Sequence, residues 1–233
     1  MSDTQAGTIL LAGASRGLGL AMAAELLDRG WQVVATVRRG KPTRLHELAE
    51  QWIGRLSIET LDIDHQDEIE AFRERLSGRI FDILFVNAGV ANAGQQSIAR
   101  TSTEEFVRVM KTNALSPMRV IEALEDLVAD DGTIGVMSSG QGSIANNNGS
   151  GLDLYRGSKA ALNQFMRSYA ARRADSARAF LLMAPGWIRT DLGGDDAPVG
   201  VEEAVPAIVD ILVGQRGQPG LRYLDRDGKS VSW

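Results

Sequence analysis

A tyrosine and a lysine stand four residues apart, at Tyr155 and Lys159. On a helix this spacing places both side chains on one face. A phenol with a pKa near 10 exchanges protons poorly at neutral pH, but a fixed cation nearby favours the phenolate. A lowering of the pKa by about three units corresponds to roughly 4 kcal/mol. The pair therefore predicts a general acid/base that exchanges a proton with an oxygen atom of a substrate.

Two hydroxyl side chains, Ser138 and Ser139, lie at the end of an apolar run that is typical of a buried strand. Ligands of a parallel sheet bind beyond the carboxyl ends of its strands. A serine at this position can hold the reacting oxygen in place beside the phenol.

A glycine-rich loop follows the first apolar run and leads into an amphipathic stretch. We expect its residues Gly13, Ser15, Arg16, Gly17, Leu18 and Gly19 to contact a cofactor. Glycine permits a tight turn and lets backbone N–H groups approach a phosphate, and the start of the following helix adds unpaired donors. The spacing Gly-x-x-x-Gly-x-Gly differs from the Gly-x-Gly-x-x-Gly fingerprint. Its position nevertheless predicts dinucleotide binding, and an ordinary tight strand-to-helix turn is the alternative.

The second expected strand, residues 32–37, ends without an acidic residue and is followed by Arg38 and Arg39. NAD sites usually place a carboxylate there, whereas an arginine accommodates the 2′-phosphate of NADP. Guanidinium groups bind phosphate through paired, charge-assisted hydrogen bonds, so Arg38 together with Arg16 favours NADP(H) over NAD(H). The alternative is that Arg38 and Arg39 are solvated surface charges. Asp62, after the third expected strand, is a candidate acceptor for an adenine amino group or, alternatively, a solvated turn carboxylate.

The composition excludes several kinds of chemistry. Cysteine is absent, which excludes disulfides, thiolate metal sites and cysteine nucleophiles, and His46 and His65 are the two histidines. We interpret the Asp-Ile-Asp-His run at 62–65 as a solvated turn, so no metal site is expected. The net charge of −5 comes from interspersed charges, so neither nucleic acid nor a membrane surface is an expected partner. Residues 1–7 are polar and no apolar run approaches the roughly 18 residues of a membrane helix, which predicts a cytoplasmic protein.

Short apolar runs alternate with amphipathic stretches along the whole chain, without an internal repeat or linker. The expected strands cover residues 8–12, 32–37, 56–61, 82–87, 133–138, 179–183 and, more weakly, 221–224. The expected helices cover residues 17–29, 43–52, 66–77, 103–114, 117–129, 154–173 and 201–213, with Ser116 as a plausible start of the fifth. This alternation predicts a single doubly wound α/β domain over residues 1–233. Its parallel sheet has about seven strands, with helices on both faces.

The order and spacing of these motifs resemble the short-chain dehydrogenase/reductase family over essentially the whole chain. The family's nucleotide motif falls on residues 12–19, and its motif after the fourth strand falls on Asn87, Ala88 and Gly89. Its helix asparagine corresponds to Asn113, its serine to Ser139, and its Tyr-x-x-x-Lys pair to Tyr155 and Lys159. Its Pro-Gly turn with a following threonine falls on Pro185, Gly186 and Thr190. Within the family, residues 155–163, 185–194 and 227–233 look most similar to the C-factor-like and sniffer-type reductases.

The resemblance implies a Rossmann-fold oxidoreductase that transfers hydride between a nicotinamide and a carbonyl/alcohol pair. Tyr155 would protonate the carbonyl oxygen, and Lys159 would bind the nicotinamide ribose and lower the pKa of Tyr155. Ser139, rather than the alternative Ser138, would orient the carbonyl, and Asn113 would hold a water that connects Lys159 to solvent. The cofactor contacts expected in addition to those above are Ile63, Trp187 and Ile188. The resemblance also implies a small-molecule substrate and a homodimer or homotetramer formed through the helices at 117–129 and 154–173.

The sequence departs from the family pattern at Ala12 and Val86, where a threonine and an asparagine are usual. Their hydroxyl and amide normally tie neighbouring strand ends together, so the local order of those ends is in doubt. Residues 144–154 are rich in asparagine and glycine and are expected to form a loop beside the substrate. Trp187 and Leu192 could contribute apolar substrate surface in a mobile segment, with core packing as the alternative.

Two other functions compete with the reductase hypothesis. A non-catalytic NADP(H)-binding regulatory or signalling protein of the C-factor type would need the nucleotide motif alone. The intact set Asn113, Ser139, Tyr155 and Lys159 argues against it, because a sensor need not keep residues that handle protons. An epimerase or dehydratase on the same fold is the third possibility.

Overall fold

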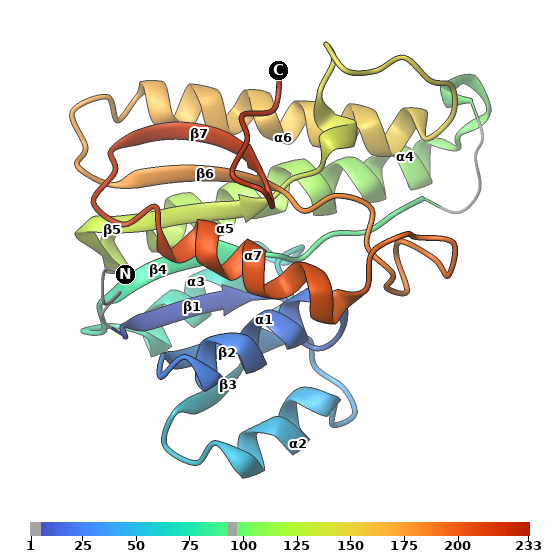
Figure 1. Cartoon of the computed structure of the whole chain (residues 1–233). Helices are drawn as coiled ribbons and strands as arrows, with labels where there is room; N and C mark the ends of the chain where they lie inside the picture. The colour runs from blue at the N-terminus through green and yellow to red at the C-terminus, as the bar shows by residue number, and fades with distance from the viewer. Residues whose placement is uncertain (1–5, 93–96) are drawn as a thin grey trace.

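The computed structural model describes residues 6–92 and 97–233, and seven parallel strands form its centre (Figure 1). Residues 1–5 of the polar N-terminal stretch lie outside the described residues. The strands are β1 (Thr8–Ala12), β2 (Gln32–Val37), β3 (Leu56–Thr60), β4 (Phe81–Val86), β5 (Val128–Met137), β6 (Ala179–Ala184) and β7 (Gly220–Asp225). Their order in the sheet is β3-β2-β1-β4-β5-β6-β7, and each neighbouring pair is parallel. The order reverses between β1 and β4, whose carboxyl ends therefore border the crevice in which such sheets bind ligands.

Helices cover both faces of the sheet (Figure 1). On one face pack α1 (Gly17–Asp28), α2 (Arg44–Gln51) and α7 (Val201–Val213); on the other pack α3 (Gln66–Arg75), α5 (Ser116–Leu124) and α6 (Asp153–Ala171). Leu26 of α1 and Ile208 of α7 belong to the apolar cluster of the first face, and Phe72 of α3 and Met166 of α6 to that of the second. The prediction of a doubly wound α/β domain is confirmed, because strands buried on both faces have continuous Ile, Val and Leu runs.

The chain from Thr103 to Leu124 forms one continuous helical segment, although the sequence predicted that a new helix starts at Ser116. A π turn, η2 (Lys111–Leu115), joins α4 (Thr103–Met110) directly to α5. Ser116 has helical backbone angles, and its hydroxyl donates to Asp64 Oδ1 at 2.7 Å instead of capping a helix. The wider π turn accommodates the missing N–H of Pro117.

Strand β5 begins five residues earlier than predicted, and the expected helix over 117–129 ends at Leu124. A short 3₁₀ turn, η3 (Glu125–Leu127), intervenes before Val128 pairs with Phe81. The register then shifts before Ile83 pairs with Thr133. This polar, irregular beginning has no apolar run, which is why its sequence does not indicate a strand.

Candidate active site

The structure brings the four predicted catalytic side chains into one cluster at the carboxyl end of the sheet. Ser139 follows β5, Tyr155 and Lys159 lie one turn apart on α6, and Asn113 lies in η2. The Ser139 hydroxyl influences the pKa of the Tyr155 phenol, and Lys159 Nζ lies 5.9 Å from the centroid of the Tyr155 ring. Asn113 and Lys159 meet at Gly89, where an added Cβ would lie 3.4 Å from Asn113 Oδ1 and 3.5 Å from Lys159 Nζ.

The pKa of Tyr155 differs from the sequence-based expectation. Burial raises it, and the hydrogen bond with Ser139 opposes this effect only in part. We predicted that the charge of Lys159 would lower it, and that prediction is wrong for this structure. Lys159 Nζ donates to the main-chain oxygen of Met137 at 2.9 Å, and burial lowers the pKa of Lys159 itself to about 8. The Tyr155 phenol is therefore protonated at neutral pH, which is the form that can donate a proton to a carbonyl oxygen.

Asn113 uses its whole amide to hold the segment that follows β4. Its Nδ2 donates to the main-chain oxygen of Val90 at 2.8 Å, and its Oδ1 accepts from the N–H of Val90, also at 2.8 Å. Nδ2 also donates to Ser158 Oγ at 3.0 Å, and the side chain is fully buried. The π turn thus places Asn113 to connect the segment after β4, at Val90, with helix α6.

The glycine loop after β1 has the shape of an anion cradle. Gly13 and Gly17 take φ angles of 91° and 55°, in the left-handed region that favours glycine. A Cβ on Gly13 would lie 2.8 Å from the nitrogen of Ala88, and a Cβ on Gly19 would lie 2.2 Å from the oxygen of Gly13. Helix α1 starts without a side-chain cap from Arg16 and without an acidic residue in its first turn. Its first N–H groups can therefore bind an anion, and the loop, with half-buried Ser15 and Leu18, fits the pyrophosphate of a dinucleotide.

Other residues order the strand ends where Ala12 and Val86 replace the family's polar residues. Asn87 Nδ2 donates to the main-chain oxygen of Gly13 at 2.8 Å, and Thr36 Oγ1 accepts from the N–H of Gly13 at 3.0 Å. Ala12 and Val86 pair directly across β1 and β4, and both are fully buried. The doubt about local order is therefore resolved, with Thr36 and Asn87 supplying the ties.

The arginines expected at the cofactor phosphates have different surroundings. Arg16 Nη1 donates to Asp191 Oδ2 at 2.9 Å, and their side chains are 71% and 73% exposed. Arg38 is exposed just after β2 and forms no ion pair with the part of the chain that the structure describes. Arg39 Nε lies 3.9 Å from Glu68 Oε1. The Arg38 guanidinium is thus available to a phosphate, whereas Arg16 is engaged with a carboxylate.

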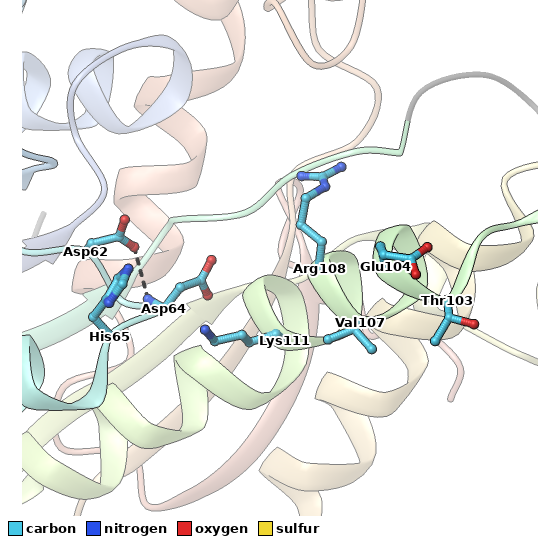
Figure 2. Close-up of a pocket in the computed structure, with 8 residues that line it drawn as sticks. All are labelled: Asp62, Asp64, His65, Thr103, Glu104, Val107, Arg108 and Lys111. Atoms are coloured by element: carbon cyan, nitrogen blue, oxygen red, sulfur yellow. Dashed lines mark hydrogen bonds between the residues drawn. The ribbon is translucent and has the colours of Figure 1, made fainter.

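A surface hollow of about 590 Å³ lies beside the turn after β3 (Figure 2). Asp62, Asp64 and His65 line one side, and Thr103, Glu104, Val107, Arg108 and Lys111 line the other. The carboxylate of Asp64 accepts from Thr112 Oγ1 at 2.6 Å as well as from Ser116, so it ties this turn to the helical segment. Asp62 Oδ1 accepts from the N–H of Asp64 at 3.0 Å, and Ile63 is buried. Asp62, the predicted adenine contact, therefore lies at the edge of a hollow with mixed charges.

The segment after β6 turns back toward the glycine loop. Gly186 has a φ of 91°, and Pro185 accepts from Arg226 Nη1 at 3.1 Å. Thr190 is the nearest neighbour of a Cβ built on Gly17, at 3.7 Å. Ile188 is buried in the core. The predicted mobile segment thus begins at a glycine turn and reaches the start of α1 through Thr190.

Trp187 and Leu192 do not pack in the core. Trp187 is 57% exposed and Leu192 is 50% exposed. Trp187 Nε1 donates to the main-chain oxygen of Gly193 at 2.7 Å. Both offer apolar surface beyond the carboxyl ends of the strands, which is the arrangement that the substrate hypothesis required.

Several side chains of the site were not found by the sequence reasoning. Two of them, Thr36 and Asp191, are described above. The guanidinium of Arg156 holds the loop before α6. Asn163 and Tyr223 contact the turn that carries Ser139. Asn163 lies one helical turn after Lys159, and Arg156 directly follows Tyr155 in the sequence. This proximity to the Tyr-x-x-x-Lys pair is a signal that could have identified both residues. Tyr223 lies too far along the chain for any such local signal.

Within residues 6–92 and 97–233, no three His, Asp or Glu side chains gather in a way that could hold a metal ion. No described helix is both long and apolar enough to cross a membrane.

Comparison with known proteins gives close matches over the full length. The family model described as enoyl-(acyl carrier protein) reductase matches residues 13–209. A crystal structure from Burkholderia multivorans, described as a short-chain dehydrogenase/reductase with bound NADP, shares 60% identity with a TM-score of 0.96, covering 98% of this chain and 100% of that one. A carbonyl reductase from Pseudomonas aeruginosa PAO1 in complex with NADP shares 36% identity with a TM-score of 0.91, covering 98% and 100% of the two chains.

Among curated proteins, the C-signal of Myxococcus xanthus is 29% identical over 167 residues, which are 71% of this chain and 100% of that protein. The resemblance to C-factor-like proteins is thus confirmed. The glycine cradle, the Ser139–Tyr155–Lys159 cluster and these matches agree, and the chain belongs to the short-chain dehydrogenase/reductase family.

Proposed function

We propose that the protein is an NADP(H)-dependent oxidoreductase that interconverts a small carbonyl compound and its alcohol. The observation that carries this proposal is the cluster at the carboxyl end of the sheet, in which the Ser139 hydroxyl lowers the pKa of the Tyr155 phenol against the effect of burial and Lys159 Nζ lies 5.9 Å from the centroid of its ring. A hydroxyl pair of this kind can hold one carbonyl oxygen from two sides. The Tyr155 phenol donates the proton, and Ser139 orients and polarises the carbonyl.

The chain's own residues provide a place for a dinucleotide. The backbone of Gly13, Gly17 and Gly19 would hold the pyrophosphate, and Asn87, Ala88 and Gly89 lie between this loop and Lys159. Bound there, the nicotinamide would supply or accept the hydride. Lys159 is buried beside the phenol, where its three donors can serve both Met137 and a ribose hydroxyl.

The preference for NADP(H) rests on Arg38. It is exposed at the end of β2, next to the place where NAD-binding folds usually carry a carboxylate, and no described residue neutralises it. The NADP bound in the similar structures from Burkholderia and Pseudomonas is consistent with this assignment.

The substrate is proposed to be neutral and partly apolar. Trp187 and Leu192 present apolar surface in the segment that follows β6, and the Arg156 and Arg226 guanidinium groups are engaged with protein oxygens. A charged substrate would have to displace one of these contacts.

The test is NADPH oxidation by the purified protein with a panel of aldehydes, ketones and quinones, measured beside Tyr155→Phe. At least one carbonyl compound should support turnover that falls by about a hundredfold or more in Tyr155→Phe. If NADPH binds but no compound is turned over above the level of that variant, the enzyme proposal is wrong and a nucleotide-binding regulator is favoured. Substrate conversion without net NADPH oxidation would indicate an epimerase or dehydratase.

A further inference from the structure

A second tyrosine, Tyr223, contacts the turn that carries Ser139. Its Oη donates to the main-chain oxygen of Ser139 at 2.5 Å, although 84 residues separate the two in the sequence. The same oxygen accepts from the N–H of Gly142 at 2.9 Å, so both of its acceptor positions are used. Tyr223 thus fixes the backbone at the residue whose hydroxyl pairs with Tyr155.

The same turn is held from α6 by Asn163. Asn163 Nδ2 donates to the main-chain oxygen of Gly142 at 3.2 Å, and its Oδ1 accepts from Ser138 Oγ at 2.5 Å. The Ser138 and Asn163 side chains also act on the pKa of the Tyr223 phenol, which burial raises. Ser138, Asn163 and Tyr223 are all buried. They form a polar network beneath Ser139 in which each member restrains the others.

Tyr223 is itself held on both sides. It pairs with Leu182 in the β6–β7 register, and its main-chain oxygen accepts from the N–H of Val231 at 2.8 Å. Its ring lies 5.4 Å from that of Trp233, and the main-chain oxygen of Trp233 accepts from the N–H of Ala145. The phenol therefore has little freedom to follow Ser139 if that residue shifts.

We propose that Tyr223 is a positioning residue for Ser139, and that Asn163 shares this role through Gly142. The assignment rests on the proposed carbonyl chemistry, because it gives Tyr223 a function only through Ser139. Tyr223 contacts neither substrate nor cofactor in this scheme. Without its hydroxyl, the main chain at Ser139 keeps one of its two restraints, and Ser139 Oγ moves relative to Tyr155. Shifts of about 1 Å in reacting groups can cost up to about a hundredfold in rate, so a partial loosening should cost on the order of tenfold.

The chain contains a matched control in Tyr169. It is also buried, and its Oη also donates at 2.5 Å, to Glu125 Oε2 in η3, which precedes β5, whereas Ser139 follows that strand. Tyr223→Phe and Tyr169→Phe each remove one buried phenol hydrogen bond and leave the ring in place. A general loss of stability should therefore lower the activity of both variants, whereas a loss of Ser139 positioning should lower the activity of Tyr223→Phe alone.

The experiment measures kcat and KM for the best carbonyl substrate, and the Kd for NADPH, in both variants and in each combined with Ser139→Ala. Tyr223→Phe should lower kcat on the order of tenfold, with the Kd for NADPH unchanged, and Tyr169→Phe should stay within about twofold of the parent. In the Ser139→Ala background, Tyr223→Phe should have no further effect, because the residue it positions is gone.

The assignment is overturned if Tyr223→Phe stays within about twofold of the parent, if it lowers kcat equally in the Ser139→Ala background, or if Tyr169→Phe is equally impaired. Should Tyr223→Phe not fold, Asn163→Ser removes the donor to Gly142 and must show the same dependence on Ser139. If the unsubstituted protein shows no Tyr155-dependent turnover, the proposed function itself fails. Normal turnover with no effect of Tyr223 refutes the positioning role alone.

Discussion

Lys159 Nζ donates to the main-chain oxygen of Met137 at 2.9 Å, and that contact holds a cation inside the protein. Only 4% of Lys159 is exposed, and burial lowers its pKa from 10.5 to about 8. An ammonium group in this position destabilises the fold, because the unfolded chain binds the proton more tightly than the folded protein does. The buried lysine of the Tyr-x-x-x-Lys motif therefore lowers the free energy of unfolding.

Lys159→Met should make the protein more stable at neutral pH while abolishing carbonyl turnover. Shifting the pKa from 10.5 to about 8 corresponds to about 3 kcal/mol, from which the lost hydrogen bond to Met137 subtracts about 1 kcal/mol. Between pH 8 and 10.5 the unfolded parent binds more protons than the folded parent, so its stability rises with pH through this window. Urea unfolding should show the advantage of the variant below pH 8 and its decline toward pH 10.5. An advantage that does not change with pH would contradict this account.

Arg38→Asp should weaken NADPH binding by about tenfold or more and leave NADH binding nearly unchanged. The reason is that Arg38 has no carboxylate partner among the described residues, so a 2′-phosphate is the group it is free to bind. Arg39→Asp is the matched control, since Arg39 lies near Glu68. Fluorescence titration of the parent and the two variants with both nucleotides measures the six dissociation constants. Equal losses for NADPH and NADH would exclude a contact between Arg38 and the 2′-phosphate.

Asp191→Asn should tighten NADPH binding by about two- to threefold at low salt. Asp191, in the segment after β6, pairs with Arg16 of the glycine loop, so it competes with the cofactor phosphates for that guanidinium. Asp195→Asn removes the same charge from the same exposed segment without breaking the pair. The gain should vanish near 1 M salt, where the Debye length is about 3 Å. A gain that is equal in Asp195→Asn would show that general charge, not the Arg16–Asp191 pair, is responsible.

Local spacing accounts for the parts of the site that could be predicted. Tyr155 and Lys159 share a helix face because they are four residues apart. The glycine loop could be predicted as a tight turn because Gly13 and Gly17 adopt left-handed angles that other residues avoid. Parallel pairing then brings Ser139 and the residues after β4 to the same edge, since every strand of such a sheet ends on one side.

The parts that could not be predicted depend on contacts between distant segments. Tyr223 lies on β7, the weakest of the expected strands, and its register against β6 decides whether its hydroxyl reaches Ser139. The pKa of Tyr155 depends on how deeply the phenol is buried and on where Lys159 finds its acceptor. The π turn at Asn113 was missed because Ser116 and Pro117 together have the signature of a helix start.

Arg156, which follows Tyr155 on α6, fastens the loop over residues 144–152. Its Nε donates to Gln141 Oε1 at 2.7 Å, and its Nη1 donates to the main-chain oxygen of Gly149 at 2.6 Å and to Asn147. At the end of this loop Leu152 has a φ of 59°, a left-handed angle that is unfavourable for a side chain with a Cβ. The guanidinium thus holds a strained, exposed loop beside the cluster.

Arg156→Lys should raise the KM for the carbonyl substrate by about threefold or more, because a lysine cannot make these forked contacts and the loop loosens. The Kd for NADPH should not change, since the cofactor cradle lies after β1 and β4. Arg172→Lys is the matched control: Arg172 lies at the end of the same helix and pairs with Glu122 at 2.6 Å, away from the loop. Steady-state kinetics with limited proteolysis of the loop gives both readouts. If Arg156→Lys leaves KM and loop cleavage as they are in Arg172→Lys, the loop does not shape the substrate site.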